Sequence, residues 1–222
     1  MDIYEFLRTI RTGQLSVDEI GCGMHKCFIN ACELIQDAEL LLEPRPGRAL
    51  SLAVLAIEEI AKTVLLANAA ARAAKTPLSW KDLEEDLDLR SHKHKQAVFA
   101  AYGEALLNKI QEEGTWYEQK VPGGLSPLLD YMKQLGFYVD VANGKFISPG
   151  EFGSDNKVWA EWLISVAKER LTSFNKLHRT QDGSVKVARK AAEFAALISE
   201  AVDEKQLKEK IDEFIKKNIQ TT

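Results

Sequence analysis

The stretch "LSLAVLAIEEIAKTVLLANAAA", from Leu50 to Ala71, is almost wholly apolar, but its middle carries the charged residues Glu58, Glu59 and Lys62. Alanine and leucine dominate the stretch, and both are strong helix formers. A membrane-spanning helix needs about 20 residues with few or no charges, and a central charge costs about 2.5–3.5 kcal/mol on insertion scales. The stretch therefore predicts a buried helix of a bundle, from about Arg48 to Ala74, rather than a membrane span.

The three charges lie at helical spacing. Residues three and four apart share a helix face, so Lys62 can reach either Glu59 or Glu58. The neighbouring turns offer only apolar residues and threonine, so we expect at least one carboxylate to point into the core, where it must be paired or neutralised. Two interpretations stay open. The cluster is either an ion network that fixes two helices in register, or a polar site where a histidine moves a proton and lysines hold an anion.

The best candidate partners for these carboxylates lie in "LRSHKHKQ", residues 89–96. His92 and Lys95 are three apart and share a helix face. His94 is two residues from His92 and lies on nearly the opposite side, so the two histidines do not form the usual metal-binding pair. The sequence also lacks the Glu-x-x-His pairs of di-iron bundles. We therefore expect no metal site and no cofactor.

The same segment carries a short basic stretch. Arg90, Lys93, His94 and Lys95 are the start of a solvated helix on one interpretation, and contacts to phosphates on the other. They are our candidates for binding a nucleic acid.

Composition sets wide limits on function. The chain has 222 residues, a net charge of -4, 45% hydrophobic and 28% charged residues, which is typical of a soluble globular protein. This charge neither requires nor excludes a nucleic-acid partner.

The N-terminal sequence does not resemble a secretory signal. Cys22, Cys27 and Cys32 are odd in number and form no CxxC pair, so we expect neither zinc nor disulfides, and a cytoplasmic location.

Helix signals recur along the chain. "SVDE", residues 16–19, is a capping box that predicts a helix to about Leu42, and the prolines of "EPRPG", residues 43–47, end it. Further predicted helices are a short one capped by Ser79, one over about 91–112, one over 126–136 with Ser126 as N-cap and Gly136 as stop, one over 155–176, and a region over 184–218 that breaks near Asp203.

The pattern changes in "FYVDVANGKFISP", residues 137–149. Two short runs of β-formers flank Asn143 and Gly144, the strongest short signal for a β-hairpin. We predict one all-α domain over residues 1–222, a bundle of long antiparallel helices decorated by a hairpin at about 137–148. Residues 1–15 are an N-terminal arm or short helix, and residues 184–222 are C-terminal helices that pack on the bundle.

Three motifs resemble the AbiV-type abortive-infection proteins, a branch of the HEPN superfamily. The first is "INACELIQDAELLLEPRPGRALSLAVLAIEEIAK", residues 29–62, which contains Glu58, Glu59 and Lys62. The second is His92 to Lys95, and the third runs from Lys133 to Val141 and from Gly144 to Pro149. They occur in the family's order over about residues 31–152.

The resemblance implies a HEPN-like helical bundle that works as a homodimer. It also implies a role in bacterial defence against phage, in which the infected cell arrests its own growth, by stopping translation. We expect an RNA, a nucleotide or a phage protein as its trigger or target, and no membrane partner. Many HEPN proteins are metal-independent endoribonucleases with an arginine four to six residues before a histidine. In them the arginine steadies the phosphate and the histidine is general acid or base.

The chain departs from that nuclease signature. Arg90 precedes His92 by one intervening residue and His94 by three, and Arg170 precedes His178 by seven. We expect Arg170 and His178 to lie on the surface. If the chain is an enzyme, a different arrangement must carry catalysis, made of Glu58, Glu59, Lys62, His92 and Lys95.

Three functions follow, in order of preference. The first is an antiphage effector that arrests growth by blocking translation through RNA or protein binding. The second is a metal-independent HEPN endoribonuclease. The third is a non-catalytic helical interaction module whose polar cluster is structural.

Overall fold

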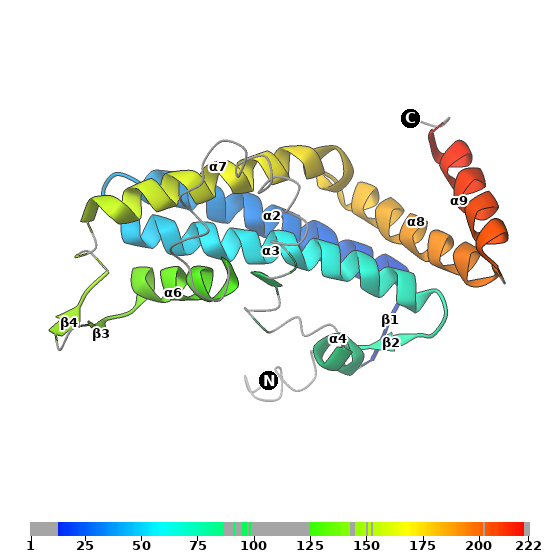
Figure 1. Cartoon of the computed structure of the whole chain (residues 1–222), viewed down its shortest axis with the longest axis horizontal. Coiled ribbons are helices and arrows are strands. Elements are labelled where there is room, and N and C mark those ends of the chain that lie inside the picture. The colour runs from blue at the N-terminus through cyan, green and yellow to red at the C-terminus, as the bar shows by residue number, and fades with distance from the viewer. Residues whose placement is uncertain are drawn as a thin grey trace, which may run out of the picture.

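The computed structural model describes residues 13–86, 91, 95–96, 98, 125–142, 145–149, 151, 153–201 and 203–219. Most of them are helical, which confirms the all-α class (Figure 1). The helices are α2 (Val17–Leu41), α3 (Pro46–Ala73), α4 (Trp80–Asp86), α6 (Leu125–Phe137), α7 (Gly153–His178), α8 (Gln181–Ser199) and α9 (Glu204–Ile219). The strands are β1 (Gln14–Leu15), β2 (Leu78–Ser79), β3 (Asp140–Ala142) and β4 (Lys145–Ile147).

Helices α2 and α3 form the centre of the bundle and run antiparallel (Figure 1). The capping box of α2 is present, because Ser16 Oγ accepts from Glu19 N at 3.2 Å and Ser16 N donates to Glu19 Oε2 at 2.8 Å. Helix α3 starts two residues before the predicted Arg48. The helix can start earlier because Pro46 takes the first helical position, where proline is well tolerated.

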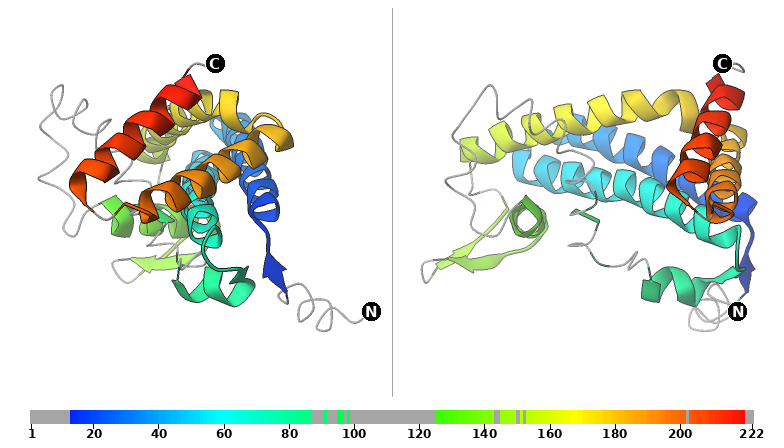
Figure 2. Two further views of the ribbon diagram at one scale, coloured as in Figure 1. Left: turned by 90° about the vertical axis from the view of Figure 1, so that its right-hand side faces the viewer. Right: turned by 45° about the vertical axis from the view of Figure 1, so that its right-hand side comes forward.

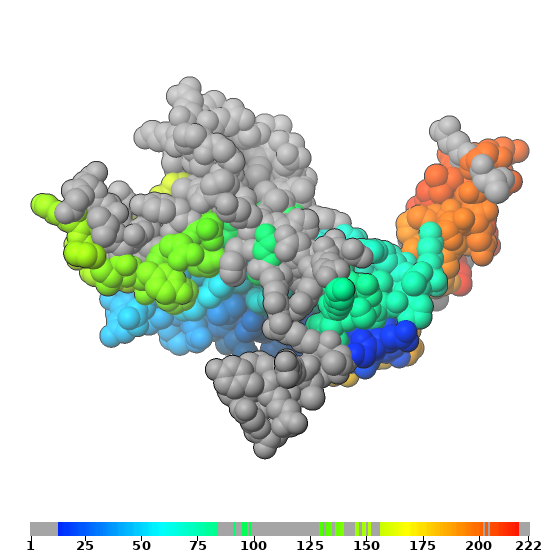
Figure 3. Space-filling view, turned by 90° about the horizontal axis from the view of Figure 1, so that it is seen from below, coloured from blue at the N-terminus to red at the C-terminus, as the bar shows by residue number. Residues whose placement is uncertain are grey.

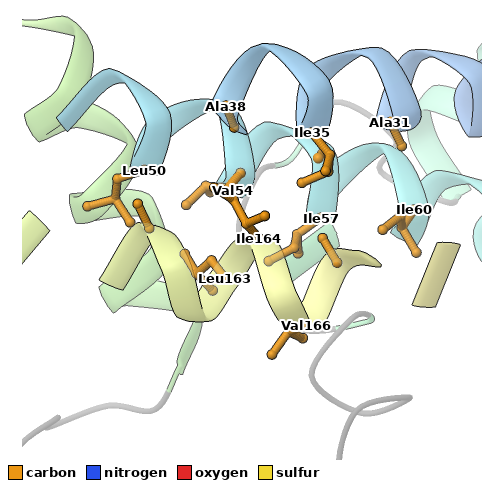
Figure 4. Packing of buried hydrophobic residues seen from close by; sticks show 14 of the residues in the cluster. Ala31, Ile35, Ala38, Leu50, Val54, Ile57, Ile60, Leu163, Ile164 and Val166 are labelled. Atoms are coloured by element: carbon orange, nitrogen blue, oxygen red, sulfur yellow. The ribbon is translucent and has the colours of Figure 1, made fainter. Parts of the chain in front are cut away.

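The core gathers around α3, against which α2, α6, α7 and α8 pack. Figure 4 shows how side chains of α2, α3 and α7 meet. They are all aliphatic and buried in one cluster; those labelled are Ala31, Ile35, Ala38, Leu50, Val54, Ile57, Ile60, Leu163, Ile164 and Val166. Within the described part of the chain, no helix is both long and apolar enough to cross a membrane.

The predicted hairpin is confirmed. Strands β3 and β4 pair antiparallel, with Val141 opposite Phe146. Asn143 and Gly144, which connect the strands, lie outside the described residues. The hairpin stands at one end of the bundle, and α9 stands at the other (Figures 1 and 3).

The predicted helix α6 is present and extends one residue further at each end, so the roles predicted for Ser126 and Gly136 were wrong. Ser126 lies inside the helix rather than at its N-cap, and Gly136 does not stop it. A Cβ on Gly136 would lie 1.9 Å from Ser51 Oγ and 2.0 Å from the carbonyl oxygen of Gly47. Glycine therefore serves at this position as the contact point at which α6 touches α3, and this role leaves no local signal in the sequence.

The C-terminal region follows the predicted pattern with shifted bounds. The break at Asp203 is confirmed, since its Oδ1 accepts from Gln206 N at 2.8 Å at the start of α9. Helix α8 docks on α2, where Arg189 makes a bidentate pair with Asp18. Helix α9 packs on α8 through Phe194 and Phe214, and Figure 2 shows it standing away from α2 and α3.

Strands β1 and β2 were not predicted, since two residues are too few for a periodic pattern. They tie the chain before α2 to the chain after α3. The Ser79 cap of α4 is confirmed, because Ser79 Oγ accepts from Asp82 N at 3.2 Å. The predicted helix over 91–112 and the apolar N-terminal arm lie mostly outside the described residues.

Candidate functional site

Glu58 lies in the middle of α3, and its side chain is 2% exposed. Lys95 Nζ is 3.2 Å from its Oε2, and Lys133 Nζ is 3.3 Å from its Oε1. Gln96 Nε2 donates to Oε1 at 2.9 Å. We call Glu58, Lys95, Gln96 and Lys133 the Glu58 cluster. It joins α3 to α6 and to the helical residues 95–96.

The charges of the cluster are balanced when Asp130, which pairs with Lys133, is counted with it. Lys133 of α6 also lies 3.0 Å from Asp130 Oδ1, so carboxylates and ammonium groups alternate from Asp130 through Lys133 and Glu58 to Lys95. Ser51 of α3 donates to the carbonyl oxygen of Lys133 at 2.7 Å and holds this turn of α6 in place. Buried ions are tolerated when every charge has an opposite partner, so this arrangement can hold the helices in one register.

Glu59 and Lys62 form a separate pair, in which Lys62 Nζ donates to Glu59 Oε1 at 2.5 Å. The sequence left Lys62 free to reach either carboxylate, and the structure assigns it to Glu59. Both side chains are partly exposed, in contrast to Glu58.

Cys27 of α2 lies against this outer pair. Burial, together with the Glu59 carboxylate that its thiol hydrogen-bonds, raises the pKa of Cys27 to about 12. A thiol must be deprotonated to act as a nucleophile, so this environment disfavours a nucleophilic role for Cys27.

The predicted catalytic residues thus divide into two groups. Glu58 and Lys95 meet in the buried Glu58 cluster. Glu59 and Lys62 form a separate pair whose side chains are partly exposed. His92 and the basic residues Arg90, Lys93 and His94 lie outside the described residues, so their roles stay predictions. Within the described part of the chain, no three histidine, cysteine, aspartate or glutamate side chains are grouped to hold a metal ion.

Lys133 and Gln96 are members of the cluster that sequence reasoning did not select as site residues. Lys133 begins the third family motif, and this position was the only feature of the sequence that could have selected it as a site residue. Its spacing within α6 resembles that of any lysine on an amphipathic helix, and 75 residues separate it from Glu58. Only the packing of α6 on α3 brings the two together.

His178 is a second polar centre, and the expectation that it lies on the surface was wrong. It is the last residue of α7 and is buried, with its ring near those of Phe28 and Phe174. Its Nδ1 lies 3.0 Å from the hydroxyl of Ser184, the buried residue near the start of α8. Its carbonyl oxygen lies 2.8 Å from Nδ1 of His25. His178 therefore joins α7, α8 and α2.

We expect the stability of the protein to depend on His178 as the pH falls. Burial lowers the pKa of His178, and so does His25 nearby, so the folded protein favours the neutral ring. An unfolded histidine titrates at about 6.5, so below that pH the unfolded chain binds more protons and the free energy of unfolding decreases. Urea unfolding at several values between pH 7.5 and 5 measures this slope. The variant His178→Gln should have a lower stability at pH 7.5 and a shallower slope, while equal slopes would contradict the prediction.

Comparison with protein-family models identifies one match, to the AbiV family of HEPN domains, over residues 19–172. Searches of curated proteins and of solved structures returned no match. The matched region runs from α2 into α7 and includes the hairpin and all four residues of the Glu58 cluster. Because the match spans more than half of the chain, the protein belongs to the AbiV family of HEPN abortive-infection proteins.

Proposed function

We propose that this chain is an antiphage effector that arrests the growth of the infected cell by binding a component of translation, and not by catalysis at the Glu58 cluster. Membership of the AbiV family implies a role in abortive infection. Binding an RNA or a protein of the translation machinery is our inference for how growth stops. We also propose that the effector works as a homodimer.

The single observation that supports binding over catalysis is the occupancy of Glu58. A general base must lie within hydrogen-bond reach, about 2.6–3.2 Å between heavy atoms, of the group that it deprotonates. Both carboxylate oxygens of Glu58 already have buried partners: Lys95 forms an ion pair with one, and Lys133 and Gln96 donate to the other. A carboxylate so neutralised is a poor base, and a side chain that is 2% exposed is hard for a substrate to reach.

Phage plating and RNA integrity test this proposal together. Cells expressing the chain should plate phage less efficiently and incorporate less labelled methionine after infection, while their ribosomal and transfer RNAs stay intact. Purified protein should inhibit translation in a cell-free system without fragmenting RNA in the presence of EDTA. RNA cleavage under those conditions would instead support the metal-independent endoribonuclease.

Variants of Glu59, Lys62 and His92 separate a structural polar cluster from a functional one. Glu59→Gln, Lys62→Met and His92→Ala should retain defence against phage if the cluster only supports the fold. Thermal unfolding of each variant is the control for stability. Defence that is lost at unchanged stability would show that these side chains act on a partner or substrate.

The proposed homodimer has its own test. Light scattering of the purified chain measures whether it is a dimer.

A further inference from the structure

The start of α3 lacks the groups that normally satisfy a helix N-terminus. Arg45 is the N-cap and its side chain makes no capping hydrogen bond, and no acidic residue lies in the first turn. Pro46 has no N–H, and no acceptor for the N–H of Gly47 occurs among the described residues. Arg45 and Arg48, both exposed, add positive charge where the helix dipole is already positive, which is unfavourable without an anion.

Four other helix starts, those of α2, α4, α8 and α9, show what is missing. Ser16 caps α2, Ser79 caps α4, Thr180 caps α8 and Asp203 caps α9, each by accepting from a first-turn N–H. Acidic residues also lie in the first turns of α2, α4 and α8. The sequence thus supplies acceptors at these helices but places two arginines at the start of α3.

Asn156 of α7 independently points to a ligand at this place. The residue is 5% exposed, and its side chain has no hydrogen-bond partner among the described residues. Its Nδ2 lies 3.3 Å from the point where a Cβ on Gly47 would stand, so the amide faces the first turn of α3. The carbonyl oxygen of Pro149 lies 2.4 Å from the same point, so a side chain at position 47 has no room. Buried amides without a partner are rare in folded proteins and call for an explanation.

We propose that the first turn of α3 binds a phosphate group, with the Gly47 N–H and the Asn156 amide as donors and Arg45 and Arg48 as the compensating charges. Phosphate oxygens accept well from helix N-terminal N–H groups, and guanidinium groups match their geometry. Glu43 is the nearest acidic residue in sequence, and Lys157 Nζ, 2.6 Å from its Oε1, neutralises it. Two positive charges therefore remain at the site. Gly47 lies about 16 Å along α3 from Glu58, so this site is distinct from the Glu58 cluster.

Titration of the full chain with inorganic phosphate tests the site. In a phosphate-free buffer at pH 7.5, phosphate should raise the melting temperature in a saturable manner and give a measurable heat in calorimetry. Sodium chloride at matched ionic strength should not reproduce either effect. Because a phosphate monoester offers the same group, adenosine monophosphate and adenosine form a second arm. Tighter binding of the monophosphate than of phosphate would identify a nucleotide as the source, and equal affinity would identify free phosphate.

Two variants and one matched control make the test decisive. Arg48→Gln removes an exposed charge without touching the core and should weaken phosphate binding on the order of tenfold, the typical effect of one charge-assisted hydrogen bond. Arg179→Gln, an exposed arginine at the end of α7, should bind phosphate like the wild type. Asn156→Leu should abolish binding.

Three results would overturn the proposal. They are the absence of saturable binding, equal affinities for the Arg48→Gln and Arg179→Gln variants, and adenosine binding as well as its monophosphate. If Asn156 only contributes to packing, Asn156→Leu will change the melting temperature equally with and without phosphate, and the wild type will not bind.

Discussion

Replacing Glu58 by glutamine is expected to lower the free energy of unfolding by about 3–5 kcal/mol, the usual cost of removing one partner from a buried ion pair. Glutamine has nearly the same shape, so the variant creates no cavity. It does remove the negative charge that compensates Lys95 and Lys133, which are both buried. Two ammonium groups would then lie in the core with only Asp130, next to Lys133, as a described carboxylate partner.

Urea unfolding followed by far-UV circular dichroism measures this loss. The matched control is Glu59→Gln, the same change one residue along α3. Glu59 pairs with Lys62 where both side chains are partly exposed, so its replacement should cost less than about 1 kcal/mol. Equal losses for the two variants would contradict the assignment of Glu58 as the charge that organises the core.

Replacing Gly136 by alanine is the change with the second largest expected effect. In an ordinary helix interior this substitution stabilises by about 1 kcal/mol. Here the new Cβ would lie 1.9 Å from Ser51 Oγ and 2.0 Å from the carbonyl oxygen of Gly47, so α6 must move away from α3. Overpacking of this kind costs about 1–3 kcal/mol or more. The displacement would also disturb the hydrogen bond from Ser51 to Lys133 and, through Lys133, the Glu58 cluster.

Gly23→Ala provides the control for this experiment. Gly23 also lies inside a helix, α2, but its added Cβ would meet only the end of the Leu66 side chain, at 3.4 Å. That variant should be neutral or more stable by up to about 1 kcal/mol. We expect opposite signs for the two glycines in chemical denaturation, and a stabilised Gly136→Ala variant would show that α6 does not pack against α3 as described.

Much of the secondary structure could be predicted because its causes are local. The capping box at Ser16 and Glu19, the proline-rich turn after α2, and the Asn143–Gly144 signal act through neighbouring residues, and the corresponding elements are all present. The two-residue strands β1 and β2 were missed for the opposite reason. Their pairing joins residues that are about 60 positions apart, and neither strand has a pattern of its own.

The sequence alone determined that α3 is a buried helix and that its central charges need partners, because helix propensity, periodicity and the cost of a buried ion depend on residue type and spacing. Only the tertiary structure decided that Glu58 points inward while Glu59 pairs with Lys62, and that Lys133 and Gln96 complete the cluster. It also decided that Gly136 is a helix contact and that Asn156 faces the first turn of α3. These relations depend on how separate helices pack, and the contacts that define them link residues whose distance in the sequence carries no periodic signal.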